Sequence, residues 1–203
     1  MPEGDAVRRL AGTLDELFVG GIVSASSPQG RFASSAALLD GWVMQRVRVH
    51  GKHMFIGFVP PTPGETYEAG VALLEGAAAG SGEPILPEDA PWPDRWVHIH
   101  LGLYGWWRFN GDETVVDEGH GVAHRIPNVA KGEWNGHSET RWGEGFGEAK
   151  AGEWEPPEPV GAVRLRLFND HAVADLVGPN RCDLITDEER IKAEAKLGPD
   201  PLD

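Results

Sequence analysis

Residues 42–59 read Trp-Val-Met-Gln-Arg-Val-Arg-Val-His-Gly-Lys-His-Met-Phe-Ile-Gly-Phe-Val, and this stretch does most to decide the fold. Its first half alternates with the period of a β-strand, one side being formed by Val43, Gln45, Val47 and Val49. A His50-Gly51 turn follows, and residues 54–59 are almost entirely apolar. Two such runs joined by a short glycine-containing turn predict a β-hairpin.

Two further regions carry paired strand patterns. They lie at residues 96–101 and 106–109, around Gly102-Leu103-Tyr104-Gly105, and at residues 163–168 and 172–177, around Asn169-Asp170. Short paired strands separated by turn residues are typical of an antiparallel β-sandwich. We therefore expect a sandwich of this kind to form the body of the protein.

Helical patterns lie near both ends of the chain. Residues 6–18 carry apolar side chains three and four positions apart, with Asp5 before them and Gly20-Gly21 after them, as in an amphipathic helix. Residues 187–196 are charged and helical in pattern and stop at Leu197-Gly198-Pro199. The expected fold is mainly β with helices, an antiparallel β-sandwich preceded by an N-terminal helix.

The composition suits one globular domain, or one domain with long insertions. The chain has 203 residues, of which 40% are hydrophobic and 25% charged. Its single cysteine, Cys182, excludes a disulfide framework or a cysteine-based zinc site within the chain, and we expect a buried small residue there. No apolar run approaches the ~20 residues that span a bilayer, and no signal-peptide pattern opens the chain. These features predict a cytoplasmic protein without a membrane partner.

The net charge of −14 argues at first against nucleic acid as a partner, because DNA affinity depends on lysine and arginine. The acidic residues, however, are concentrated in two segments of the chain. Residues 60–95 hold one basic residue against seven acidic ones, and residues 111–160 hold four against eleven. Both segments are rich in glycine and proline, and we interpret them as acidic surface insertions.

The first residues of the chain carry a possible chemistry. Removal of Met1 would leave Pro2 with a free secondary amine beside the carboxylate of Glu3. Such an amine attacks an aldehyde-like carbon to form an iminium, and a helix N-terminus favours its neutral, reactive form. The alternative is ordinary helix-start chemistry, in which proline occupies a first helical position and acids follow it.

Four landmarks occur in order: Met1-Pro2-Glu3-Gly4-Asp5, Gly51-Lys52, His100-Leu101-Gly102-Leu103-Tyr104-Gly105 and Leu197-Gly198-Pro199-Asp200-Pro201-Leu202. Together they resemble the N-terminal domain of the formamidopyrimidine-DNA glycosylase and endonuclease VIII family. The Gly-Asp pair after Pro-Glu and the Leu-Tyr-Gly-Trp-Trp-Arg turn are more similar to the endonuclease VIII branch. The resemblance covers about residues 1–59, 96–110 and 161–203.

The resemblance implies a bacterial base-excision repair enzyme, associated with the nucleoid, that binds damaged double-stranded DNA. It implies a DNA glycosylase that removes oxidised bases, pyrimidines being favoured, and an abasic-site lyase. Pro2 would be the Schiff-base nucleophile at C1′ of the damaged deoxyribose and Glu3 the proton donor that opens the sugar ring. Lys52 would complete the catalytic core.

The resemblance also assigns three residues to DNA binding. His100 would touch a flanking phosphate, and Leu103 and Tyr104 would fill the gap left by an extruded base, since apolar side chains can replace lost stacking. Without the resemblance, Leu103 and Tyr104 read as an ordinary hairpin tip and His100 as a strand histidine. Lys52 would then be a solvated turn lysine.

Family members continue into a helix-two-turn-helix domain and usually a finger domain that binds zinc. Residues 1–184 are therefore expected to form the catalytic domain and residues 185–203 to begin a helical DNA-binding domain, completed by a missing segment or a separate chain. We expect weak activity from this chain alone and no cofactor in it. His98 with His100, and His120 with His124, could suggest a metal, but Gly119 and Gly121 argue against a metal-binding helix. We assign no metal ligand.

A different class of function stays open at this point. The chain could be a non-catalytic β-sandwich that binds a protein partner through its acidic insertions.

Overall fold

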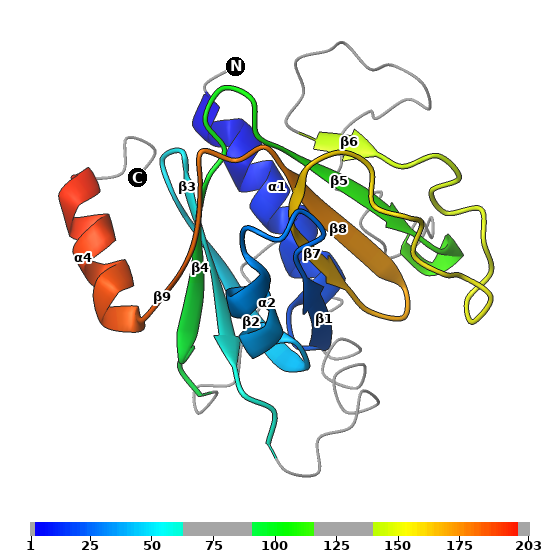
Figure 1. The fold of residues 1–203 in the computed structure, drawn as a ribbon, viewed down its shortest axis with the longest axis horizontal. Coiled ribbons are helices and arrows are strands. Elements are labelled where there is room, and N and C mark those ends of the chain that lie inside the picture. The colour runs from blue at the N-terminus through cyan, green and yellow to red at the C-terminus, as the bar shows by residue number, and fades with distance from the viewer. Residues whose placement is uncertain (1–2, 63–90, 116–139, 199–203) are drawn as a thin grey trace.

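The computed structural model describes residues 3–62, 91–115 and 140–198 (Figure 1). Its helices are α1 (Glu3–Phe18), α2 (Ala33–Leu39), the short 3-10 helix η1 (Glu113–Val115) and α4 (Asp187–Leu197). Its strands are β1 (Ile22–Ser26), β2 (Trp42–His50), β3 (His53–Val59), β4 (Arg95–His100), β5 (Trp106–Gly111), β6 (Thr140–Trp142), β7 (Val163–Phe168), β8 (Ala172–Val177) and β9 (Arg181–Ile185). In this part of the chain, no helix has the length and apolar character to cross a membrane.

The strands form one continuous series in the order β6-β5-β8-β7-β1-β2-β3-β4-β9. Every pairing is antiparallel except that of β5 with β6. Strand β1 joins two layers, because its first residues pair with β2 and its last residues pair with β7. One layer is β2-β3-β4-β9 and the other is β7-β8-β5-β6, and they diverge from β1 as Figure 1 shows. The mainly antiparallel β fold with an N-terminal helix is confirmed.

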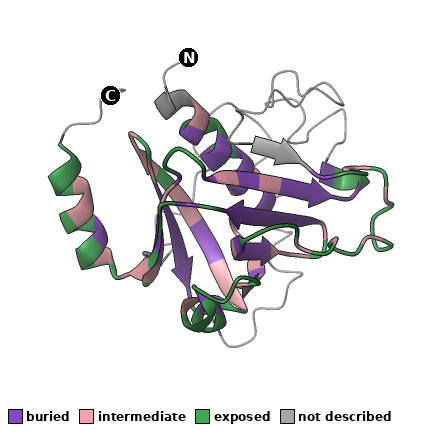
Figure 2. Ribbon diagram, turned by 45° about the horizontal axis from the view of Figure 1, so that its top comes forward, coloured by how far each residue is buried: buried purple, intermediate pink, exposed green. Residues whose placement is uncertain are grey.

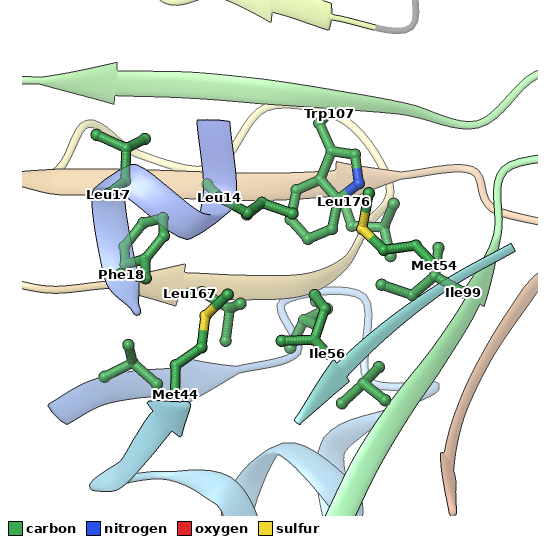
Figure 3. Close-up of a cluster of buried hydrophobic side chains, with 14 of the residues drawn as sticks. Leu14, Leu17, Phe18, Met44, Met54, Ile56, Ile99, Trp107, Leu167 and Leu176 are labelled. Atoms are coloured by element: carbon green, nitrogen blue, oxygen red, sulfur yellow. The ribbon is translucent and has the colours of Figure 1, made fainter. Parts of the chain in front are cut away.

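The core lies between the two layers and helix α1 (Figure 3). Helix α1 contributes the side chains that its period predicts, namely Val7, Leu10, Ala11, Leu14, Leu17 and Phe18. Met54, Ile56 and Ile99 meet them from one layer, and Trp107, Leu167 and Leu176 meet them from the other. Trp107 and Leu14 are fully buried. Burial of such side chains contributes about 1.5–3 kcal/mol each, so this cluster holds α1 in a fixed position between the layers.

The predicted hairpin at residues 42–59 is confirmed, with its turn one residue later than expected. His50 pairs with His53, so Gly51 and Lys52 form the turn. Gly51 has φ +57, a conformation that glycine adopts without steric cost. The predicted pair at residues 163–168 and 172–177 is also confirmed as β7 and β8.

The predicted pairing within residues 95–109 is wrong. Strand β4 lies between β3 and β9 in one layer, and β5 lies between β8 and β6 in the other. The turn at residues 101–105 therefore crosses between layers and is no hairpin tip. Both edges of β4 are already occupied by other strands, so β5 has no place beside it.

Helix α4 confirms the helical pattern near the end of the chain. It begins with a capping box in which the Thr186 side chain accepts a hydrogen bond from the Glu189 N–H and the Glu189 side chain accepts one from the Thr186 N–H. It packs beside β4 and β9, with its outer surface exposed (Figure 2). Cys182 in β9 is buried as expected, and burial raises the pKa of its thiol to about 12.

Part of the second acidic segment packs onto the sandwich. The Gly143 N–H donates to the Phe109 carbonyl at 2.7 Å, and the Gly147 N–H donates to the Gly111 carbonyl at 2.8 Å. These bonds attach the backbone after β6 to the end of β5. Residues 63–90 and 116–139, which hold much of both predicted insertions, lie outside the described residues.

Candidate functional site

Four parts of the chain meet at one end of the molecule. They are the N-terminal end of α1, the β2–β3 turn, the β4–β5 loop and the β8–β9 connection, all at the top of Figure 1 and again near one another in Figure 2. Strand pairing accounts for much of this arrangement, because His53 directly after the turn pairs with His100 directly before the β4–β5 loop. His100 in turn pairs with Arg181, the first residue of β9.

The structure brings together four of the six residues that the sequence singles out. Lys52 lies in the β2–β3 turn, His100 ends β4, and Leu103 with Tyr104 forms the β4–β5 loop. Glu3 is the first residue of α1, at the end where these loops lie. Pro2 is outside the described residues.

The β4–β5 loop presents two large apolar side chains to solvent. Leu103 is 82% exposed and Tyr104 is 78% exposed, although the neighbouring Leu101 and Trp107 are buried. The loop is held at both ends: the Gly105 N–H donates to the Leu101 carbonyl at 3.0 Å. The loop thus holds two adjacent large apolar side chains in a position where a partner could reach them.

The β8–β9 connection supports this loop from beneath. A Cβ placed on Gly102, which has φ +68, would lie 2.4 Å from the Asn180 side chain. A Cβ on Gly178 would lie 3.3 Å from the Tyr104 carbonyl oxygen. The two segments are therefore in close contact, and glycine at position 102 is what allows Asn180 to approach the loop backbone.

A network of histidines lies beside the loop on β3 and β4. His53 Nδ1 and His98 Nε2 are 2.9 Å apart, so one ring donates and the other accepts. Burial first, then the positive charge of neighbouring histidines and Arg181, lowers the pKa of each of these two residues to about 4. His98 is 3% exposed and stacks on Phe55 with ring centroids 4.3 Å apart. Both rings are therefore neutral at pH 7.

His100 stands between two cations. Burial lowers its pKa, and the charges of Lys52 and then Arg181 lower it further. The charges of Lys52 in the turn and of Arg181 at the start of β9 thus both act on His100 at the end of β4. Two cations therefore lie near this end of the sheet, in a chain whose net charge is −14.

Helix α4 is attached to the same layer at its other end. The Arg190 side chain is almost fully buried, lies 4.8 Å over the Trp96 ring, and pairs with Asp187 and Glu194 at 2.7 and 2.5 Å. Burial raises the pKa of Asp187, but hydrogen bonds from Arg190 and the neighbouring tryptophans, together with the charge of Arg190, outweigh burial, and the net shift is downward. The helix is therefore fixed against the outer face of β4.

The chain can now be compared with known proteins. No protein-family model matches it. It is 32% identical over 202 residues to Endonuclease 8 1 of Mycobacterium bovis and to Endonuclease 8 1 of Mycobacterium tuberculosis, and the match covers 100% of this chain and 49% of each relative. The chain is thus similar over its whole length to a protein named as an endonuclease VIII. It spans about half the length of the curated relatives it matches.

The fold also resembles a solved structure. The crystal structure of a complex between the Lactococcus lactis Fpg protein, a THF-DNA and an inhibitor matches with a TM-score of 0.51 at 12% identity. The match covers 96% of this chain and 47% of that chain. The architecture of two β layers with an N-terminal helix is therefore that of a known fold.

Three residues of this end were missed by sequence reasoning: His53, Asn180 and Arg181. The sequence shows no local signal for them, because their importance comes from strand register and from a contact between distant loops. Among the described residues no three His, Cys, Asp or Glu side chains are grouped as a metal site would require. His120 and His124 lie outside the residues that the structure describes.

Proposed function

We propose that this chain is the catalytic N-terminal part of a bacterial base-excision repair DNA glycosylase with abasic-site lyase activity. Oxidised bases are its substrates, with pyrimidines favoured, and damaged double-stranded DNA is its partner. The observation that carries the proposal is the meeting of the α1 N-terminus, the Lys52 turn and the Leu103-Tyr104 loop at one end of the molecule. Similarity to a protein named as an endonuclease VIII supports it.

The chemistry begins at the N-terminus once Met1 has been removed. The neutral Pro2 nitrogen attacks C1′ of the damaged nucleotide, and the base leaves with its bonding electron pair and takes up the proton that the Pro2 nitrogen loses. Glu3 gives a proton to the ring oxygen, the C1′–O4′ bond breaks, and the lone pair of the nitrogen forms the new C1′=N bond. The product is an iminium between Pro2 and the opened sugar. Because α1 begins at Glu3, its positive end disfavours protonation of the Pro2 amine.

The lyase step follows from the iminium. The positive nitrogen acidifies the C2′ hydrogen, a base removes that proton, and the electron pair expels the 3′ phosphate. Lys52 is proposed to hold this phosphate and to move protons during the elimination, because a compact ammonium group suits a phosphate contact. The two-residue turn between β2 and β3 fixes its backbone.

Leu103 and Tyr104 are proposed to enter the duplex where the damaged base has left the stack. Rotating a base out of the helix costs a few kcal/mol, and apolar or aromatic side chains recover part of the lost stacking. Their exposure of 82% and 78% leaves both side chains accessible to DNA, as this role requires.

The proposal is tested by borohydride reduction of the chain bound to duplex DNA that contains one abasic site. Reduction converts an iminium into a stable covalent adduct, which we expect for the chain with a processed N-terminus. A form with an uncleaved N-terminal extension should give no adduct, because Pro2 then has no free amine. Mass spectrometry of the intact protein verifies which N-terminus each sample carries.

Two variants separate the roles of the other residues. Glu3→Gln should lower release of an oxidised base by at least about 100-fold. Lys52→Ala should lower strand cleavage, and Lys150→Ala, which removes an exposed lysine far from this end, should leave it unchanged. Absence of any adduct from folded, processed chain would instead favour a non-catalytic sandwich that binds a protein through its acidic segments.

The 203 residues alone are expected to bind DNA weakly at physiological salt. Their net charge is −14, which opposes binding to a polyanion, and DNA affinity falls steeply with salt when it depends on few phosphate contacts. Binding and trapping assays of the chain should therefore be carried out at low salt concentration.

A further inference from the structure

The outer face of the β2-β3-β4-β9 layer ends in a row of four basic residues. His50 pairs with His53, His53 pairs with His100, and His100 pairs with Arg181. Residues directly opposite one another on neighbouring strands present their side chains on the same face. We call His50, His53, His100 and Arg181 the basic row.

The basic row faces away from the core. In β3, β4 and β9 the alternate positions, among them Ile56, Val97 and Cys182, join the buried cluster between the layers. Because side chains alternate along a strand, the row lies on the opposite face. Three intervals of about 4.8 Å make it roughly 14 Å long, while successive nucleotides of one DNA strand rise by only about 3.4 Å. The row is therefore long enough to follow more than one phosphate.

The next row inward differs sharply in composition. Arg48 pairs with Phe55, Phe55 with His98 and His98 with Asp183. This row therefore has an arginine that is ion-paired with Glu194 at one edge, a stacked aromatic pair at its centre and a carboxylate at the other edge. The Asp183 carboxylate lies 3.2 Å from Arg181 Nε, and both side chains are more than half exposed. Only the row nearest the Lys52 turn consists of basic residues throughout.

Two cations, Lys52 and Arg181, act on the histidines of the row and on His98 beside it. The charges of Lys52 and Arg181 both oppose protonation of His100, and Arg181 also opposes protonation of His53 and His98. Arg181 Nη1 lies 3.5 Å from His98 Nδ1. These two cations would attract an anion, and a neutral histidine can donate one N–H to a phosphate oxygen.

We propose that the basic row is a binding site for the phosphodiester backbone of DNA, in which Arg181 is the principal charge and His53 and His100 donate N–H groups. The proposal rests on the proposed function and extends its DNA contacts beyond Lys52 and His100. It assigns to the edge strand β9 a contact that no local sequence motif indicates.

The test measures binding of the full 203-residue chain to two fluorescent duplexes, one undamaged and one with an abasic site, over a range of salt concentrations. Arg181→Ala should weaken both complexes about fivefold at low salt and reduce the slope of log K against log[salt] by about 0.9, the loss of one phosphate contact. Asp183→Asn should tighten binding, because it removes a competing carboxylate beside Arg181.

Arg95→Ala is the matched control, since it removes one arginine from the opposite end of β4. Equal affinities and slopes for Arg181→Ala and Arg95→Ala would overturn the basic row even if trapping succeeds. Row-dependent binding without trapping would refute the proposed chemistry and leave the row supported. Wild-type chain that binds neither duplex at low salt would contradict both. Circular dichroism of each variant establishes that it is folded.

Discussion

Gly102 is the single position on which the shape of the β4–β5 loop most clearly depends. Its φ is +68, and a Cβ there would lie 2.4 Å from Asn180. Leu103 and Tyr104, the exposed pair that the proposed function places in the DNA, follow it directly. The sequence predicts the exposed pair but not its support, because the contact joins segments 78 positions apart in the chain.

Gly102→Ala should therefore lower the free energy of unfolding by about 1–3 kcal/mol, through backbone strain and displacement of Asn180. Gly12→Ala is the matched control. A Cβ at this exposed position of α1 meets nothing within 4 Å, and alanine should raise the free energy of unfolding by about 0.5–1 kcal/mol. Urea unfolding followed by circular dichroism measures both. Equal values for the two variants would contradict the described loop contact.

The strands of the β2-β3-β4-β9 layer, and strand β1 beside it, show which strands and pairings sequence patterns predict and which they do not. Alternation between residues 42 and 59 predicts β2 and β3, because one face of each strand is buried. Strand β1 is short, with serine at two of its five positions, and its pattern gives no comparable signal. The wrong pairing of β4 with β5 arose because local alternation identifies strands but contains no information about which layer each one joins.

Pairing of β3 with β4 brings His53 and His98 together, and this contact predicts that the stability of the protein depends on pH. The pKa values of His53 and His98 fall to about 4 in the folded protein from about 6.5 in the unfolded chain. Between these values the unfolded chain binds more protons, so stability rises with pH and is lost as pH falls from about 6.5 to about 4. Urea midpoints at pH 7.5, 6.5, 5.5 and 4.5 should decrease, and less steeply in His53→Gln. A midpoint independent of pH in this window would show that the two rings are not neutral partners.

At the scale of the whole molecule, the expected catalytic N-terminus directly precedes helix α1, which is packed into the core. Helix α1 contributes six buried side chains between the two layers, so its first residues have a fixed position relative to the Lys52 turn and the Leu103-Tyr104 loop. Catalytic groups need such rigid support, since small displacements cost large factors in rate. As far as the structure describes them, the first three landmarks thus lie at one end of the molecule.

The central claim is that the N-terminal amine of Pro2 forms the covalent bond to DNA. The most direct measurement is tandem mass spectrometry of the borohydride-reduced complex with abasic-site DNA after digestion of both protein and DNA. We expect the reduced sugar remnant on the peptide that begins with Pro2, attached to its ring nitrogen. A remnant on Lys52 or on another lysine, with Pro2 unmodified in fully processed protein, would contradict the account.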